Sequence, residues 1–347
     1  MQMSEFTYNL PEELIAQFPP KTRGTTNLLV LDKESGEINH KKYFNIPEYI
    51  NKGDVVVLNE TKVINSRTFF ITPRNNTQVQ VLFLEDLGEE KWYCLIKYAK
   101  CVHEGDILTN STGSEITINV LERKGPGFVV QFKSGTSEQL FTKYGHTPLP
   151  PYMKREDKES DKVRYNTVFS NIPGAVAAPT ASLNLTDEIL KDIKEKGAEI
   201  AKIELRVGWG TFAPIREENI EEHNIHSEYI SVSKESADII NNCIKNVGKV
   251  WAFGTTVART LESVSYLDKE SGKYFVKSYN GDTNLYIYPG YEWKIVNTLV
   301  TNFHKPDSSL ILLVSAFAGK ENIKKTYAQA IEKRYAFLSY GDSMLIK

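Results

Sequence analysis

The sequence predicts an α/β protein, in which a mostly parallel, layered sheet domain carries a small inserted antiparallel β-barrel domain. Three observations predict this fold class. In residues 1–62 and 151–347, apolar strands alternate with helical periods, as in layered sheets with helical crossovers. In residues 63–150, short alternating segments are separated by Gly, Asn and Ser turns, which is typical of a small barrel or sandwich. Glycine turns or polar clusters follow several outer strands, at the edge where open α/β sheets hold their ligands. We therefore expect a main domain of residues 1–62 and 151–347 and an inserted barrel domain of residues 63–150.

The first outer segment begins with short elements and ends in a polar cluster. Residues 10–13 place proline and acids at the start of a short helix, and residues 28–32 form a strand. Residues 54–58 are nearly all apolar, which is typical of a strand covered on both faces. The polar residues 59–62, which include Glu60, follow at the carboxyl end of that strand.

Residues 174–216 read as a loop, a helix, a strand and a glycine loop. Thr186 stands at an N-cap position, and Gly197 stands where the helix ends. Residues 201–207 alternate as a strand and run into the sequence GWGT at 208–211. A strand that ends in a glycine turn leaves backbone N–H groups open to a ligand, although a plain strand-to-loop turn is an equal alternative.

The last outer segment repeats this pattern. A helix over 233–248 precedes a strand over 249–253, and Gly254-Thr255-Thr256 then starts a helix at a second turn suited to a ligand. The sequence further predicts strands at 285–288 and 295–300 and helices at 308–319 and 322–334.

The inserted segment and the stretch that follows it have different textures. Strands are expected at 78–84, 92–97, 115–121 and 127–133, before a helical period at 137–144. The mixed-charge run at 154–162 is interpreted as a mobile, solvated loop.

Composition limits the classes of function. The 347 residues carry a formal net charge of −2, so no global positive field attracts nucleic acid, and RNA contact would come from a local patch. The cysteines Cys94, Cys101 and Cys243 form no C-x-x-C pair, which indicates a reducing compartment. No secretory signal or membrane-length apolar run is present. These features predict a cytoplasmic protein.

Two histidines and a carboxylate form the most distinctive polar cluster. His223, His226 and Glu228 are the ingredients of a metal site, but H-E-x-x-H and a third ligand are missing, so we expect no metal. Acid–base chemistry or hydrogen bonding to a polar ligand fits better, because histidine titrates near neutrality and Glu228 could orient His226. A structural histidine pair is an equal alternative. The sequence contains no P-loop, no dinucleotide fingerprint and no G-x-S-x-G elbow.

Twelve short blocks, in order along the whole chain, carry a family resemblance. They are FTYNLPEELIAQ (6–17), LNETKV (58–63), GHTPLPPY (145–152), RYNTV (164–168), AVAAPTA (175–181), VGWGTF (207–212), HNIHSE (223–228), GTTVARTLES (254–263), YPGY (288–291), TNFHKP (301–306), VSAFAG (314–319) and SYGDSMLI (339–346). With these blocks in register, the chain resembles the S-adenosylmethionine:tRNA ribosyltransferase-isomerase family of queuosine biosynthesis.

The resemblance implies a cytoplasmic, tRNA-modifying transferase and isomerase. Such an enzyme moves the ribosyl part of S-adenosylmethionine, its co-substrate, onto the 7-aminomethyl-7-deazaguanine at the tRNA wobble position. The products are epoxyqueuosine, adenine and methionine. A base must take a proton from the carbon beside the sulfonium, and an acid should assist the departure of adenine. The implied partner is the anticodon loop of tRNA, and the resemblance implies no metal and no membrane.

The same resemblance suggests roles for particular residues. The candidates for proton transfer are His226, Glu228, His304, Asp342, His223 and Glu60. The candidates for cradling S-adenosylmethionine or the modified base are Gly208, Gly210, Thr211, Gly254, Thr255, Thr256, Pro179, Thr180 and Ala181. The candidates for phosphate contact are Arg23, Lys62, Arg67 and Arg259.

Several positions depart from the family pattern, and they cluster in the same loops. Gly24 and Asn27 stand where the family usually has an acid and an arginine, and Glu60 stands for an aspartate. Ser182 and Asn184 replace a glycine and a histidine, and an amide cannot titrate as histidine does. Further departures in the glycine loop are Arg206 and Trp209.

These departures keep two alternatives open beside the transferase. One is a paralogue that uses S-adenosylmethionine on a different acceptor, in a pocket reshaped by Ser182, Asn184 and Trp209. The other is a non-catalytic RNA-binding homologue. Retention of the candidate acids and bases argues against the second alternative, and the replaced histidine at position 184 argues for it.

Overall fold

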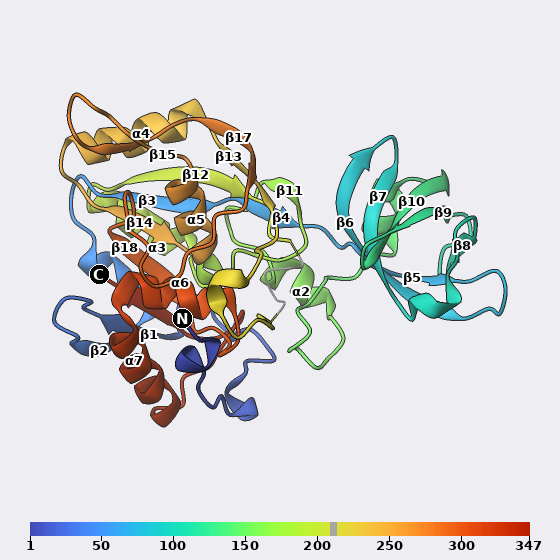
Figure 1. The fold of residues 1–347 in the computed structure, drawn as a ribbon, viewed down its shortest axis with the longest axis horizontal. Helices are drawn as coiled ribbons and strands as arrows, with labels where there is room; N and C mark the ends of the chain where they lie inside the picture. The colour runs from blue at the N-terminus through green and yellow to red at the C-terminus, as the bar shows by residue number, and fades with distance from the viewer. Residues whose placement is uncertain (209–213) are drawn as a thin grey trace.

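A nine-stranded sheet forms the centre of the larger domain in the computed structural model, which describes residues 1–208 and 214–347 (Figure 1). Its strands, in spatial order, are β17 (Tyr279–Thr283), β13 (Glu228–Val232), β12 (Glu199–Leu205), β3 (Val55–Asn59), β14 (Val250–Phe253), β18 (Thr298–Asn302), β19 (Ser343–Ile346), β1 (Asn27–Leu31) and β2 (Ile38–Lys42).

Four neighbouring parallel strands form the middle of this sheet. Strands β12, β3, β14 and β18 run parallel, and every residue of β3, β14 and β18 is buried, as expected for strands covered on both faces. The flanks are antiparallel at β13, β17 and β2, and β19 pairs antiparallel with β18 but parallel with β1. The predicted α/β class with a parallel, layered sheet is thus confirmed, with its parallel character concentrated at the centre.

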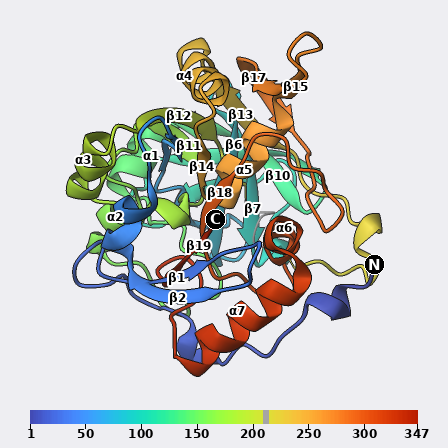
Figure 2. The same cartoon turned by 90° about the vertical axis from the view of Figure 1, so that its left-hand side faces the viewer.

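Helices cover both faces of the sheet (Figure 2). The α-helices of this domain are α2 (Glu159–Arg164), α3 (Asp187–Glu195), α4 (Lys234–Lys245), α5 (Thr255–Ser263), α6 (Ser309–Ala318) and α7 (Lys320–Glu332). Alternate strand residues divide between two cores: Val57 and Ala252 face the side of α4 to α7, whereas Leu58 and Phe253 face α3 and the 3₁₀ helix η3 (Tyr43–Tyr49). Because successive side chains of a strand point to opposite faces of the sheet, the position of a residue in the strand decides which helices it packs against.

The smaller domain is a closed barrel that stands beside the sheet domain (Figure 1). Its strands, in spatial order, are β10 (Gly127–Ser134), β7 (Lys91–Lys97), β6 (Gln78–Gly88), β5 (Arg67–Ile71), β8 (Ile107–Asn110) and β9 (Thr117–Lys124), all antiparallel. Aromatic rings fill it: Phe83 stacks on Phe132, and Trp92 meets Phe141 of α1 (Ser137–Lys143) edge on. The inserted barrel is confirmed, while its boundaries at 62/63 and 150/151 stay a prediction.

Two short sheets lie outside the main sheet and the barrel. Strand β4 (Thr61–Val63) pairs in parallel with β11 (Ile172–Ala175) where the chain leaves the sheet domain, and β15 (Ser265–Leu267) pairs with β16 (Tyr274–Val276).

The mixed-charge run 154–162, interpreted as a mobile, solvated loop, is a partly exposed loop only over 154–158, because α2 begins at Glu159 and several side chains of the run have internal partners. Arg155 makes a two-pronged bond to the buried Asp161, at 2.7 and 2.8 Å. Asp157 accepts a hydrogen bond from Arg67 of β5 at 2.5 Å, which ties the run to the barrel. Carboxylates with internal partners hold this segment in place, a distinction that composition alone does not carry.

The predicted strand at 285–288 was wrong, because these residues belong to no strand in the part of the chain described. Helix α5 holds the segment instead. Arg259 Nε donates to the carbonyl of Leu285 at 3.0 Å, and Glu262 accepts from the backbone N–H groups of Ile295 and Val296 at 2.9 and 3.0 Å.

Among the described residues, no helix is long and apolar enough to cross a membrane.

Candidate functional site

The carboxyl ends of the four central strands gather the turns that follow them at one edge of the sheet. Because these strands are parallel, β12 leads to Gly208, β3 to Glu60, β14 to Gly254 and β18 to His304 at the same edge. Strand β13 runs the opposite way, so its first residue, Glu228, also lies there. The topology brings predicted residues from five separate blocks to one place.

Gly254 caps α5 in a conformation that only glycine adopts readily, with φ at +111°. A Cβ added at Gly254 would lie 3.6 Å from the Cβ of Ala181, which places η5 (Thr180–Ser182) beside the start of α5. The buried Tyr43 fixes η5 by donating to the carbonyl of Ala181 at 2.8 Å. Among the described residues, no side chain caps the first turn of α5, so its N–H groups face this edge without a capping acceptor there.

A buried ion pair forms the wall of the site on the β13 side. Arg259 of α5 donates to Glu228, and both side chains are about 5% exposed. The other carboxylate oxygen of Glu228 accepts from the N–H of Gly208 at 3.0 Å. Arg259 was expected to contact phosphates, but its burial and this ion pair keep it inside the protein. Glu228, a candidate for proton transfer, is likewise held in this ion pair.

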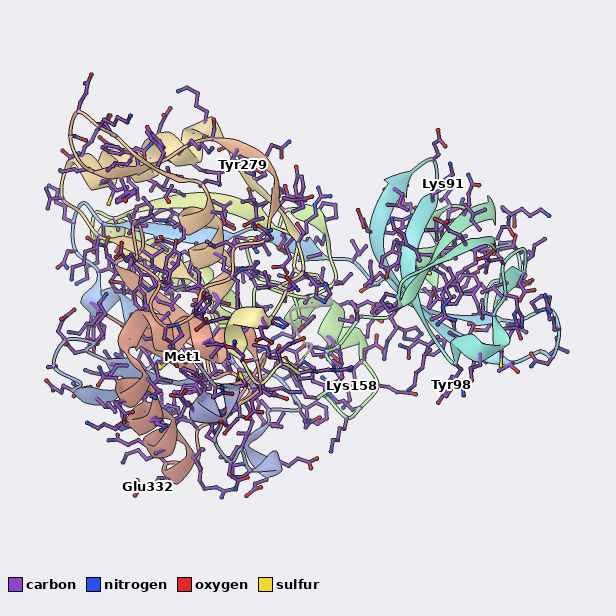
Figure 3. All side chains as sticks on the ribbon, in the orientation of Figure 1. Met1, Lys91, Tyr98, Lys158, Tyr279 and Glu332 are labelled. Atoms are coloured by element: carbon purple, nitrogen blue, oxygen red, sulfur yellow. The ribbon has the colours of Figure 1, made fainter. Side chains whose placement is uncertain are left out.

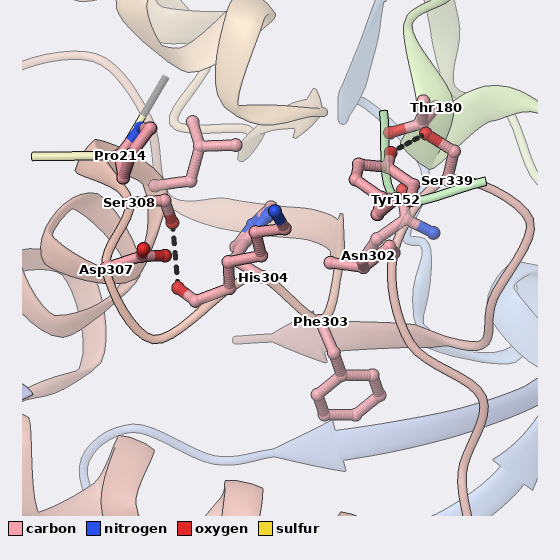
Figure 4. A pocket seen from close by; sticks show the side chains of 12 residues that line it. Tyr152, Thr180, Pro214, Asn302, Phe303, His304, Asp307, Ser308 and Ser339 are labelled. Atoms are coloured by element: carbon pink, nitrogen blue, oxygen red, sulfur yellow. Dashed lines mark hydrogen bonds between the residues drawn. The ribbon is translucent and has the colours of Figure 1, made fainter. Parts of the chain in front are cut away.

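His304 lies in a pocket at the end of β18, with Tyr152, Asn302 and Ser339 around it (Figure 4). Its Nε2 shares a hydrogen bond of 2.8 Å with the Thr301 hydroxyl. Burial lowers the pKa of His304 to about 3, so the imidazole is neutral at physiological pH. A neutral, weakly basic His304 can accept or donate a hydrogen bond but is poorly suited to supply a proton.

Several buried polar side-chain atoms of the described residues have no hydrogen-bond partner, and four of them lie on η5, on α5 and at the end of β18. These four are Ser182 Oγ, Thr256 Oγ1, Arg259 Nη2 and Asn302 Oδ1. Buried polar groups are nearly always satisfied, so orphaned ones require an explanation such as a missing ligand or water. Their gathering on η5, α5 and the end of β18 marks this edge as a site for a polar ligand.

The other proton-transfer candidates have different surroundings. Asp342 is buried, which raises its pKa, and both of its oxygens accept hydrogen bonds, from Asn27 and from the N–H of Ala336. His223 bonds to Glu217 at 2.8 Å, and Glu60 pairs with Lys202 at 3.2 Å. His226 is exposed, two residues before Glu228. The structure thus gives Asp342 a structural setting and leaves His226 accessible.

Two more arginines expected at phosphates make internal contacts instead. Arg23 donates to the carbonyls of Leu183, Val163 and Asn166 at 2.8 to 3.0 Å, and burial lowers its pKa. Arg67 is bound to Asp157 and is 15% exposed. Lys62 is exposed on β4, so its ammonium is accessible to a phosphate.

The remaining predicted residues divide between this edge and the undescribed stretch. Pro179 precedes η5 directly, and Thr255 is buried in the first turn of α5. Gly210, Thr211 and Trp209 lie outside the described residues. Arg206 packs on the Tyr229 ring and pairs with Glu204 at 2.6 Å.

Sequence reasoning missed some residues that line the pocket. Tyr152 and Ser339, whose hydroxyls are 2.5 Å apart, and Asn302 all stand in the quoted blocks, yet no role was assigned to them. The one feature of the sequence that could have pointed to these residues is their place in those blocks. The local sequence does not show that residues 152 and 339 lie side by side. Among the described residues, no group of three or more His, Cys, Asp or Glu side chains could hold a metal ion.

The fold and site define an α/β protein with an inserted barrel and with unpartnered buried polar atoms at the carboxyl edge of its parallel strands. A family model described as "Queuosine biosynthesis protein" matches residues 3–346, and the chain belongs to this family.

Named relatives are similar to this chain over nearly their whole length. The chain is 43% identical to the S-adenosylmethionine:tRNA ribosyltransferase-isomerase of Syntrophomonas wolfei, covering 99% of this chain and 97% of the relative. It is 42% identical to the protein of the same name from Aquifex aeolicus, with both chains fully covered. The crystal structure of an S-adenosylmethionine tRNA ribosyltransferase from Thermotoga maritima is similar with a TM-score of 0.56 and 32% identity, covering 99% of this chain and 100% of that one.

We predict that Arg259→Met lowers the free energy of unfolding by about 3 to 5 kcal/mol, because it leaves the Glu228 carboxylate buried without its cation. The double variant Glu228→Gln/Arg259→Met should lose less free energy of unfolding than the two single variants lose together. Urea unfolding gives the free energy of unfolding of the two single variants and the double variant. Lys234→Met, which removes half of an exposed pair with Asp238, is the control and should change stability little. A small loss for Arg259→Met would contradict the prediction.

We predict that His304 makes stability fall on acidification. The pKa in the folded chain is about 3 and the ordinary value is 6.5, so below pH 6.5 the unfolded chain takes up a proton that the folded chain does not. Between pH 7 and pH 5 this difference lowers the free energy of unfolding by about 2 kcal/mol. Urea unfolding at both pH values should show a smaller decrease for His304→Gln than for the unmodified protein. The same replacement at the exposed His226 is the control, and an equal loss in the His304→Gln and unmodified proteins would refute the assignment.

Proposed function

We propose that this protein is an S-adenosylmethionine:tRNA ribosyltransferase-isomerase. It moves the ribosyl part of S-adenosylmethionine to 7-aminomethyl-7-deazaguanine at the tRNA wobble position, giving epoxyqueuosine, adenine and methionine. The observation that carries this proposal is the set of orphaned buried polar atoms at the sheet edge where the family motifs converge. A site already filled by its own side chains would not leave Ser182, Thr256, Arg259 and Asn302 unsatisfied.

The turns at the carboxyl edge fit the donor. Gly208 and Gly254 let the backbone approach a ligand, and the uncapped first turn of α5 offers N–H donors at Thr255 and Thr256. Pro179, Thr180 and Ala181 form the facing wall, and Gly210 and Thr211 complete the proposed set. Bound there, S-adenosylmethionine supplies a sulfonium whose charge acidifies the neighbouring carbon.

The proposed division of labour follows the surroundings of each side chain. His226 is accessible at this edge and is the proposed proton acceptor. His304 stays neutral and orients polar groups in the pocket, held by Thr301. Glu228 positions the backbone at Gly208, and the unpartnered Nη2 of Arg259 is the proposed hydrogen-bond donor to the ligand. We propose no metal for this reaction.

The proposed partner is the anticodon loop of tRNA, and the proposed compartment is the cytoplasm, where tRNA and free thiols such as those of Cys94, Cys101 and Cys243 occur together. Lys62 is the remaining candidate for phosphate contact from the original set.

A different acceptor is the second candidate function. It is favoured by Ser182, whose buried hydroxyl stands unsatisfied in the site at a departure from the family pattern. A hydroxyl there can bond to an acceptor group that a glycine cannot reach.

We predict that the purified protein, incubated with S-adenosylmethionine and tRNA carrying the aminomethyl-deazaguanine, forms adenine, methionine and the epoxycyclopentyl nucleoside. Mass spectrometry detects all three products. Binding of S-adenosylmethionine without any product would instead support the different acceptor, and Ser182→Gly/Asn184→His should then gain the activity. Absence of both binding and product would refute the enzyme.

We predict that His226→Asn slows product formation by about 100-fold or more, because an amide cannot accept the proton. Calorimetric binding of S-adenosylmethionine should persist, which separates proton transfer from binding. His103→Asn, at an exposed histidine of the barrel, is the matched control and should leave the rate unchanged. An unaffected rate in His226→Asn would remove His226 from the mechanism.

A further inference from the structure

An exposed phenylalanine flanked by two cations lies on the sheet domain outside the pocket. The Phe18 ring is 53% exposed, although phenylalanine usually lies in the core. The guanidinium carbon of Arg155 lies 4.5 Å from the ring centroid, and the ammonium of Lys158 lies 4.7 Å from it. We call these three residues the Phe18 platform.

The two cations are held in different ways. Arg155 is fixed, because Asp161 binds it with two hydrogen bonds and its Nε donates to the carbonyl of Gln17 at 2.6 Å. Lys158 is exposed, and within the described residues its ammonium has no carboxylate partner. The nearby carboxylates of Glu12 and Glu159 are paired with Lys154 and Lys162. Lys158 is therefore available to an anion brought by a partner.

The platform adjoins the proposed active site. Gln17, the neighbour of Phe18, donates to the carbonyl of Tyr152 at 3.1 Å, and Tyr152 lines the pocket of His304. Lys158 lies on the side of the sheet domain that faces the barrel (Figure 3). Asp157, the residue before it, binds Arg67 at the first strand of the barrel. A macromolecule that delivers a base to the pocket would pass this surface.

We propose that the Phe18 platform binds the anticodon loop, with an unpaired nucleotide next to the modified one stacked on Phe18 and its phosphate near Lys158. An aromatic ring beside cations is the combination that holds single-stranded nucleic acid, because every base has a flat face and every linkage a negative charge. This inference rests on the proposed function, since it takes tRNA as the substrate.

The test compares Phe18→Ala with Phe44→Ala in binding to an anticodon stem-loop RNA and to S-adenosylmethionine. Phe44 is the matched control, because it is 52% exposed and none of the cation contacts among the described residues involves it. Phe18→Ala should weaken RNA binding by about 5- to 150-fold, as expected for one lost base–aromatic stack, and leave S-adenosylmethionine binding unchanged. Phe18→Trp should keep RNA binding, because it keeps a ring.

A second arm uses Lys158→Gln. The slope of log affinity against log salt for the stem-loop should fall by about 1, whereas Lys245→Gln should leave it unchanged. Lys245 is a suitable control because it is also an exposed lysine near a phenylalanine ring, 5.9 Å from Phe275.

The outcomes separate this inference from the proposed function. If the unmodified protein makes the epoxy nucleoside but Phe18→Ala binds the stem-loop as Phe44→Ala does, the platform is not an RNA contact and the inference is wrong. Equal losses of RNA and S-adenosylmethionine binding would also overturn it, because they indicate a structural role. If the unmodified protein binds no tRNA, the proposed function is wrong, and the inference that rests on it is wrong as well.

Discussion

The buried ion pair between Arg259 and Glu228 is the constraint on which the ligand edge depends. Taking two charges out of water costs several kcal/mol per ion, and hydrogen bonds to both side chains offset part of that cost. Gly208 and the carbonyl of Leu285 supply two of them, so α5, β13 and the end of β12 are joined at one point. Because Arg259 stands little more than one turn from Gly254, this joint also fixes the first turn of α5 against the glycine turn of β12.

A second buried charge on the same helix extends this constraint. Glu262 accepts hydrogen bonds from the N–H groups of Lys294, Ile295 and Val296 and from the hydroxyl of Tyr291. Arg259 and Glu262 therefore hold the segment from 285 to 296 at both ends, and this segment needs no strand partner. The sequence LYIYPGY has the apolar and aromatic residues of a strand, which is why a strand was predicted there. Local pattern shows that a segment is extended and cannot show whether a neighbouring strand is in reach.

The fold could be predicted where the signal is local. The apolar run at 54–58, the alternation at 201–207 and the helical period at 233–248 correspond to β3, β12 and α4, because side-chain period and caps are properties of short stretches. The place of β19 between β18 and β1 could not be predicted, since it joins residues more than 300 positions apart. The same limit applied to the site. Motif order located the edge of the sheet, but whether an arginine faces solvent or a carboxylate depends on distant partners, as with Arg259.

Two of the departures from the family pattern, Asn27 and Asn184, contact the same distant loop. Asn27 donates to Asp342 at 3.1 Å and accepts from Lys42 at 2.7 Å, so a neutral amide connects a buried carboxylate to an exposed ammonium. Asn184 donates to the carbonyl of Gly341 at 3.4 Å. Both departures thus converge on the loop at 341–342, which follows Ser339 in the wall of the pocket. Two changes that are far apart in the sequence therefore contact the same loop, next to the wall of the pocket.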